Sequence, residues 1–131
     1  MATLTPAQAE LFQEANYAVL TTLRADGSPH NTVVWVEWDG SNVRFNTVVG
    51  RAKHRHLERD PRASITIVKE PYKWVTVSGR CTLSTDGAEE QIDRLAKKYL
   101  GEETYPWRTD ADVRIGVTLS IDKVDAFGFE G

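Results

Sequence analysis

Residues 17–47 read YAVLTTLRADGSPHNTVVWVEWDGSNVRFNT and hold three β-rich runs separated by two Asp-Gly turns. The runs cover residues 17–24, 31–38 and 43–47, and the turns lie at Asp26-Gly27 and Asp39-Gly40. Asp-Gly favours the tight turns that connect neighbouring antiparallel strands. This stretch therefore predicts an antiparallel meander.

The rest of the chain adds more β structure and a few short helices. We expect further strands at residues 63–69, 73–84, 113–121 and 123–129, and a loop at residues 102–112. Helices are expected from Thr5-Pro6 onward, over residues 51–60, and from a cap at Asp86 to a stop at Gly101. Side chains in residues 73–84 alternate between an apolar and a polar face. This alternation places Cys81 in the core, as a small apolar residue. Seven strands in 131 residues predict a single domain, residues 1–131, with a closed or split antiparallel β-barrel.

The composition excludes several classes of protein. With 40% apolar and 27% charged residues, the chain is neither disordered nor collagen-like nor a coiled coil. One cysteine and three histidines predict no disulfide framework and no metal site. The sequence lacks an apolar run of ~20 residues and an apolar leader, so we expect a cytoplasmic protein without a membrane partner.

Positive charge is concentrated in residues 51–62, RAKHRHLERDPR. This segment holds five basic and two acidic residues, a local charge of +3 in a chain whose net charge is −3. A protein that binds nucleic acid is normally basic over a whole face. The confined charge therefore favours a small anionic ligand over a nucleic acid.

The start of the predicted helix at residues 51–60 is a candidate phosphate site. Free N–H groups and the helix dipole at this end attract anions, yet the first turn carries Arg51, Lys53 and Arg55. Cations at this position are unfavourable unless a bound anion offsets them. A solvated basic face is the alternative, and we expect such a face for His54 and His56, which are two residues apart and cannot pair as metal ligands on a helix.

Aromatic residues give a second signal. Core filling is the default expectation for each of six aromatic residues: Trp35, Trp38, Tyr72, Trp74, Tyr105 and Trp107. Tyr72 and Trp74 flank Lys73 at a strand start beside a proline, a barrel-rim position where a planar ligand could stack. We find no Ser-His-Asp order and no paired carboxylates in apolar surroundings, so no catalytic residue is assigned.

The stretch Gly50–Ile65, GRAKHRHLERDPRASI, resembles a motif of the flavin/deazaflavin oxidoreductases, which are relatives of pyridoxamine 5′-phosphate oxidase with a split β-barrel fold. The segments TTLRADGSPH, VVWVEWDG and YKWVTVSGR also match, so the resemblance covers nearly the whole chain. The chain is most similar to the branch that uses coenzyme F420, a deazaflavin with a phosphate and an acidic oligoglutamate tail.

This resemblance implies a homodimer with cofactor sites at the subunit interface. It assigns the phosphate to Arg51, Ala52 and Lys53, with Arg55 and His56 nearby. It assigns the deazaflavin ring to backbone groups of Thr32, Val33, Val34 and Trp35. It takes Tyr72 and Trp74 from the other subunit.

The implied activity is transfer of a hydride from reduced F420 to a conjugated or quinone-like small organic acceptor. Because the cofactor carries this chemistry, the lack of obvious catalytic residues is expected. An FMN-binding enzyme like pyridoxamine-phosphate oxidase is the alternative, and a non-catalytic cofactor-binding protein is a further one. Arg55, Arg59 and Arg62 favour the longer, more acidic F420 over FMN.

Overall fold

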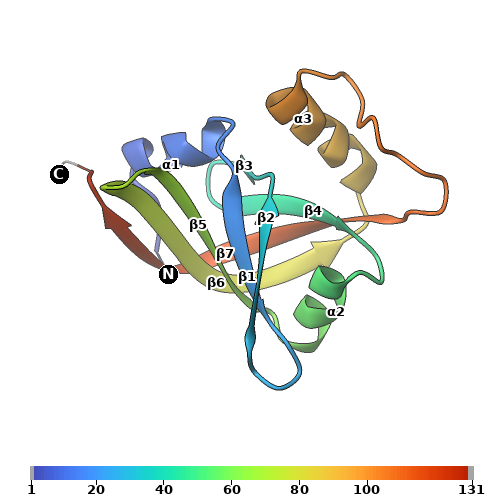
Figure 1. Ribbon diagram of the computed structural model, residues 1–131, viewed down its shortest axis with the longest axis horizontal. Helices are drawn as coiled ribbons and strands as arrows, with labels where there is room; N and C mark the ends of the chain where they lie inside the picture. The colour runs from blue at the N-terminus through green and yellow to red at the C-terminus, as the bar shows by residue number, and fades with distance from the viewer. Residues whose placement is uncertain (1, 130–131) are drawn as a thin grey trace.

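The computed structural model describes residues 2–129 as one curled antiparallel sheet with three helices around it (Figure 1). The strands are β1 Ala18–Leu23, β2 Pro29–Val34, β3 Glu37–Trp38, β4 Val43–Val48, β5 Arg62–Glu70, β6 Lys73–Ser84 and β7 Arg114–Phe127. The helices are α1 Pro6–Gln13, α2 Ala52–Arg59 and α3 Ala88–Leu100. The mainly β architecture expected from the sequence is confirmed.

The two edge strands of the sheet are neighbours in the sequence. The strand order is β2-β1-β5-β6-β7-β4-β3, yet only Trp35 and Val36 separate β2 from β3. The step from Val34 to Glu37 covers three residues and spans at most about 10 Å. The chain can cross from one edge to the other over that distance only because the sheet curls until its edges approach each other. The fold is therefore a split barrel, and the single strand expected over residues 31–38 is wrong.

Two side chains of α3 hold the junction between β2 and β3. The N–H of Val36 donates to Tyr99 Oη at 3.1 Å, and the carbonyl of Val36 accepts from Lys98 Nζ at 2.6 Å. Lys98 also donates to the carbonyl of Phe12, and Tyr99 donates to the carbonyl of Asn16 at 2.7 Å. These bonds replace the strand partners that Val36 would otherwise need. They let the chain leave one edge and join the other.

Tyr99→Phe should lower the free energy of unfolding by about 1–3 kcal/mol, because it removes two hydrogen bonds and leaves the partly buried N–H of Val36 without an acceptor. Urea unfolding followed by circular dichroism measures this loss. Tyr17→Phe is the matched control, since the Tyr17 side chain is 63% exposed. Equal midpoints for the two variants would contradict the role given to Tyr99.

The last two predicted strands form one long strand, β7, with a bulge where a break was expected. Ser78 pairs with Lys123 and Gly79 pairs with Ile121, so Asp122 is the extra residue. A bulge bends a strand and increases its twist without ending it. The expected division into residues 113–121 and 123–129 is therefore wrong, and the added bend helps the sheet to close.

The core lies on the concave side of the sheet. Its fully buried side chains include Leu20, Phe45, Ile65 and Val77, and α1 closes one end of the barrel with Phe12. The predicted start of α1 is confirmed, because Thr5 and Gln8 form a capping box. Cys81 is confirmed as a core residue, and burial raises the pKa of its thiol to about 12.

The other two helices flank strand β4. Helix α2 packs on β1 and β4, and α3 packs on β4 and β7 (Figure 1). Gly87, with φ of 71°, is the N-cap of α3, so the expected cap at Asp86 is wrong, whereas the stop at Gly101 is confirmed. Among residues 2–129, no helix combines the length and apolar character needed to cross a bilayer.

Candidate functional site

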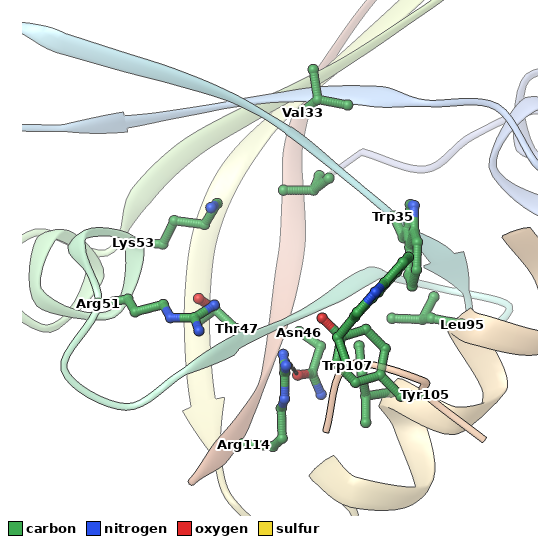
Figure 2. A pocket seen from close by; sticks show the side chains of 12 residues that line it. Val33, Trp35, Asn46, Thr47, Arg51, Lys53, Leu95, Tyr105, Trp107 and Arg114 are labelled. Carbon is green, nitrogen blue, oxygen red and sulfur yellow. Dashed lines mark hydrogen bonds between the residues drawn. The ribbon is translucent and has the colours of Figure 1, made fainter. Parts of the chain in front are cut away.

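A cavity of about 190 Å³ lies between α2, α3 and the end of β2 (Figure 2). It is lined by Val33, Val34, Trp35, Asn46, Thr47, Arg51, Lys53, Ile92, Leu95, Tyr105, Trp107 and Arg114. Six separate segments of the chain contribute these residues, which the curled sheet brings together. The cavity has a cationic side, an aromatic side and a polar side.

The cationic side is the start of α2. Arg51 is the N-cap without a side-chain cap bond, and the first turn carries no acidic residue. Arg51 lies 3.6 Å from Asp112 and is more than half exposed. Lys53 is about half-buried, and burial followed by Arg51 lowers its pKa. Among residues 2–129 no carboxylate forms an ion pair with Lys53.

The aromatic side is built from β2 and the loop after α3. Trp35 stacks on Tyr99 with centroids 5.4 Å apart and planes 8° apart, and Tyr105 meets Trp35 edge-on. Trp107 lies edge-on to Tyr105 and is 60% exposed. Tyr105 and Trp107 therefore border the cavity, and the expectation that they mainly fill the core is wrong. Aromatic side chains at the border of a cavity can pack against a planar ring, face-on or edge-on.

The loop that carries Tyr105 and Trp107 is fastened to α3. The N–H of Tyr105 donates to Asp93 Oδ1 at 2.9 Å, and Arg108 forms ion pairs with Asp93 and Glu89. Glu89 lies in the first turn of α3, where the helix dipole favours a carboxylate. The loop thus has a defined position over the cavity.

The polar side joins β4, α3 and β7. Asn46 Nδ2 donates to the carbonyl of Ala88 and to Gln91 Oε1, both at 2.9 Å. Its Oδ1 accepts from Arg114 Nη1 at 3.3 Å. The fully buried Gln91 donates in turn to Glu37. Neither Asn46 nor Arg114 was expected from the sequence as a site residue, because only the pairing of β4 with β7 brings them together.

The two histidines of α2 are buried, so the expected solvated face is wrong. His54 Nδ1 accepts from the N–H of Gly50 at 2.9 Å and closes the turn before the helix. His56 Nδ1 lies 2.9 Å from Thr22 Oγ1, and its ring meets His30 edge-on. Burial and then His30 lower the pKa of His56. Both side chains are buried because the short helix packs against β1 and β4.

The structure brings only part of the predicted cofactor set together in one chain. Val33, Val34, Trp35, Arg51 and Lys53 line the cavity. The other predicted residues do not line it. Thr32 comes directly before Val33 in β2, and Ala52 lies in the first turn of α2. Arg55 donates a hydrogen bond to the carbonyl of Gly50, and His56 contacts Thr22.

Tyr72 and Trp74 lie elsewhere in the chain, at the turn between β5 and β6. Tyr72 is 77% exposed, and Trp74 pairs with Val68 and Phe127 on the outer face of the sheet. The expectation that Tyr72 fills the core is therefore wrong, and neither residue lines this chain's cavity. Their assignment to a neighbouring subunit's site stays a prediction.

Other parts of the described structure suit an anionic aromatic ligand less well than this cavity. A larger hollow of about 600 Å³ near Ser41 and Ser120 has no aromatic or basic side chain in its lining. Within the described part of the chain, no group of three His, Cys, Asp or Glu residues is arranged to hold a metal ion. The smaller cavity is therefore the better candidate for an anionic aromatic ligand.

Known proteins resemble this chain in sequence and in fold. The family model for pyridoxamine 5′-phosphate oxidase matches residues 4–124. An F420H(2)-dependent biliverdin reductase from Mycobacterium tuberculosis (strain CDC 1551 / Oshkosh) is 31% identical over 117 residues, which cover 86% of this chain and 85% of that protein. An F420 reductase structure superimposes with a TM-score of 0.81 at 22% identity, covering 93% of this chain and 98% of that one. A FAD and heme binding protein from Mycobacterium smegmatis gives 0.73 at 16% identity, covering 99% and 73%.

Proposed function

Because this chain belongs to the pyridoxamine 5′-phosphate oxidase family, we propose that it is a reductase that uses coenzyme F420 and passes a hydride to a conjugated or quinone-like small organic acceptor. The observation that carries the proposal is the half-buried Lys53, which faces a cavity with an aromatic wall and has no carboxylate partner among the described residues. The name of the 31% identical relative supports F420 as the cofactor.

The residues present fit such a cofactor. Arg51 and Lys53 flank the start of α2, where free backbone N–H groups add to the positive potential for a phosphate. Two polar atoms of β2, His30 Nδ1 and Thr32 Oγ1, are buried without a hydrogen-bond partner among residues 2–129. Buried polar atoms are rarely left unpaired, so these two are candidates to face a ligand or an ordered water.

The deazaflavin ring would lie against the end of β2. This strand is at the edge of the sheet, so the backbone groups on its free side have no strand partner. Val33, Val34 and Trp35 are the β2-end residues that line the cavity. When bound, the cofactor supplies the hydride chemistry. The chain binds its phosphate, orients its ring and limits the access of water through Tyr105 and Trp107.

A direct assay tests this function. Purified protein is mixed with F420H2 and a quinone such as menadione without oxygen, and the return of the visible absorbance of oxidised F420 is followed. We expect turnover that depends on both protein and acceptor. Turnover with FMN and an external reductant, but none with F420H2, would support the FMN-binding alternative instead.

We further propose that the protein acts as a homodimer. The outer face of the sheet exposes apolar side chains in register, with Val19 opposite Val33 and Trp74 between Val68 and Phe127. An exposed apolar band of this kind is unusual on a monomer and suits a second copy of the chain. Such packing would bring Tyr72 and Trp74 to the neighbouring subunit.

Analytical ultracentrifugation should therefore give about twice the chain mass of 14.7 kDa. Val19→Lys places a charge in the middle of the apolar band and should shift the protein toward the monomer, because an unpaired buried charge is costly. Lys123→Ala, on an exposed part of β7, is the control and should leave the mass unchanged. A wild-type species at the chain mass would overturn the dimer, and with it the assignment of Tyr72 and Trp74.

A further inference from the structure

Arg114 is a buried cation that the proposed cofactor site does not use. It is the first residue of β7, is only 8% exposed and lines the cavity. None of its guanidinium nitrogens forms an ion pair with a carboxylate of residues 2–129, and only Nη1 has a hydrogen-bond acceptor. A buried charge without a counter-charge is costly unless a ligand supplies one. The other guanidinium donors are therefore available to the cavity.

The surroundings of Arg114 fix its orientation. Asn46 turns its Oδ1 toward Arg114 because its Nδ2 is held by Ala88 and Gln91 of α3. The guanidinium lies over the ring of Tyr105, 4.6 Å from the centroid. Figure 2 shows Arg114 rising beside Asn46 near the aromatic residues, while Arg51 and Lys53 enter from α2. The arrangement holds a guanidinium with free donors beside the aromatic side of the cavity.

We propose that Arg114 binds a carboxylate on the hydride acceptor, so that the enzyme prefers conjugated acceptors that carry an acid group. The proposal rests on the proposed function and specifies its substrate class. A planar guanidinium matches a carboxylate with two parallel hydrogen bonds, which an ammonium cannot provide. The acceptor's conjugated part would lie against Tyr105 and Trp107, which adjoin Arg114 on the same side of the cavity.

The phosphate of the cofactor is a less suitable partner for Arg114. Arg51 and Lys53 already provide two cations at the start of α2, a different element from β7. Arg114 instead contacts residues of β4 and of the aromatic loop. Separate cationic groups in one cavity suit two anions on two molecules, the cofactor and the acceptor.

The first test needs no cofactor. Isothermal titration calorimetry compares 2-naphthoate with the neutral 2-naphthamide, which has the same ring. We expect wild-type protein to favour the acid, and Arg114→Gln to weaken 2-naphthoate binding about ten- to a hundredfold while leaving 2-naphthamide unchanged. Arg114→Lys keeps the positive charge but lacks the planar guanidinium. Its affinity for 2-naphthoate should therefore lie between those of the wild type and Arg114→Gln. Arg80→Gln, at an exposed position of β6, is the control.

Thermal unfolding separates this role from a structural one. If the cation is kept for a ligand, Arg114→Gln should fold and keep the wild-type melting temperature or exceed it. A marked fall in melting temperature, with no loss of preference for 2-naphthoate in Arg114→Lys, would mean that Arg114 only braces Asn46 and Tyr105. That result would overturn the proposal.

The second test uses the loaded enzyme and a matched pair of acceptors, a quinone carboxylic acid and its methyl ester. In Arg114→Gln the KM for the acid should rise about ten- to a hundredfold, with kcat and the ester little changed and F420 affinity unchanged. Weaker F420 binding with unchanged KM for the acid would assign Arg114 to an anionic group of the cofactor and overturn the proposal. Arg114-dependent naphthoate binding without F420 binding would leave the carboxylate site standing and contradict the F420 function instead.

Discussion

Lys53→Ala should weaken F420 binding by about ten- to a hundredfold, because each charge-assisted hydrogen bond to a partly buried phosphate contributes roughly 1.5–3 kcal/mol. Lys53 is half-buried, has no carboxylate partner among the described residues and lines the cavity. Arg51→Ala should have a similar but smaller effect, since Arg51 is more exposed and already lies 3.6 Å from Asp112. Equilibrium fluorescence titration at two salt concentrations measures both changes.

Arg62→Ala is the control for this prediction. Arg62 is exposed, lies beyond the end of α2 and is paired with Asp60 at 2.7 Å, so its removal should have only a weak, salt-sensitive effect. The fold should survive all three substitutions, because none of these side chains is part of the apolar core. Unchanged affinity in both Lys53→Ala and Arg51→Ala would mean that the start of α2 is only a solvated basic face.

The same lysine predicts a pH dependence. Its pKa is lowered in the cofactor-free protein, chiefly by burial, so it loses its proton at a lower pH than an exposed lysine. Only the protonated form attracts a phosphate, and F420 affinity should therefore fall as the pH rises through that lowered pKa. Lys53→Arg should remove this decline, because a guanidinium keeps its charge.

Gly79→Ala should destabilise the protein by about 3 kcal/mol, at the upper end of the usual effect of overpacking. A Cβ at this position would lie 1.8 Å from the carbonyl oxygen of Ser120, a backbone atom that cannot move without disturbing the pairing of β6 with β7. Urea unfolding should show a lower midpoint, and Ser78→Ala, at the neighbouring half-buried position, is the control. A wild-type midpoint for Gly79→Ala would show that the bulge at Asp122 is not as closely packed as described.

Local signals in the sequence predicted local features of the fold. The Thr5 and Gln8 capping box, the two Asp-Gly turns and the helix after Gly50 all depend on neighbouring residues, and each is present. The break at Trp35 and Val36 could not be predicted in this way, because the apolar run of residues 33–36 passes through it without a glycine, a proline or another turn residue. The residues that stabilise it, Lys98 and Tyr99, are more than 60 residues away in the sequence.

The same holds for the site: features set by neighbouring residues could be predicted, and features set by residues far apart in the sequence could not. The excess of cations at the start of α2 is a local signal, and Arg51 and Lys53 line the cavity. Their binding of a phosphate stays a prediction. The burial of His54 and His56 depends on packing of α2 against the sheet, which the polar sequence of the helix does not reveal. Asn46 and Arg114 become neighbours only through the register of β4 with β7, so no local motif identifies them.

Titration of the cofactor-free protein with F420 and with FMN tests the central claim most directly. The quenching of cofactor fluorescence gives both dissociation constants under one set of conditions. The split barrel with its cationic cavity predicts low-micromolar or tighter binding of F420 and much weaker binding of FMN. Equal affinity for the two cofactors, or a preference for FMN, would contradict the assignment of this chain as an F420-dependent reductase.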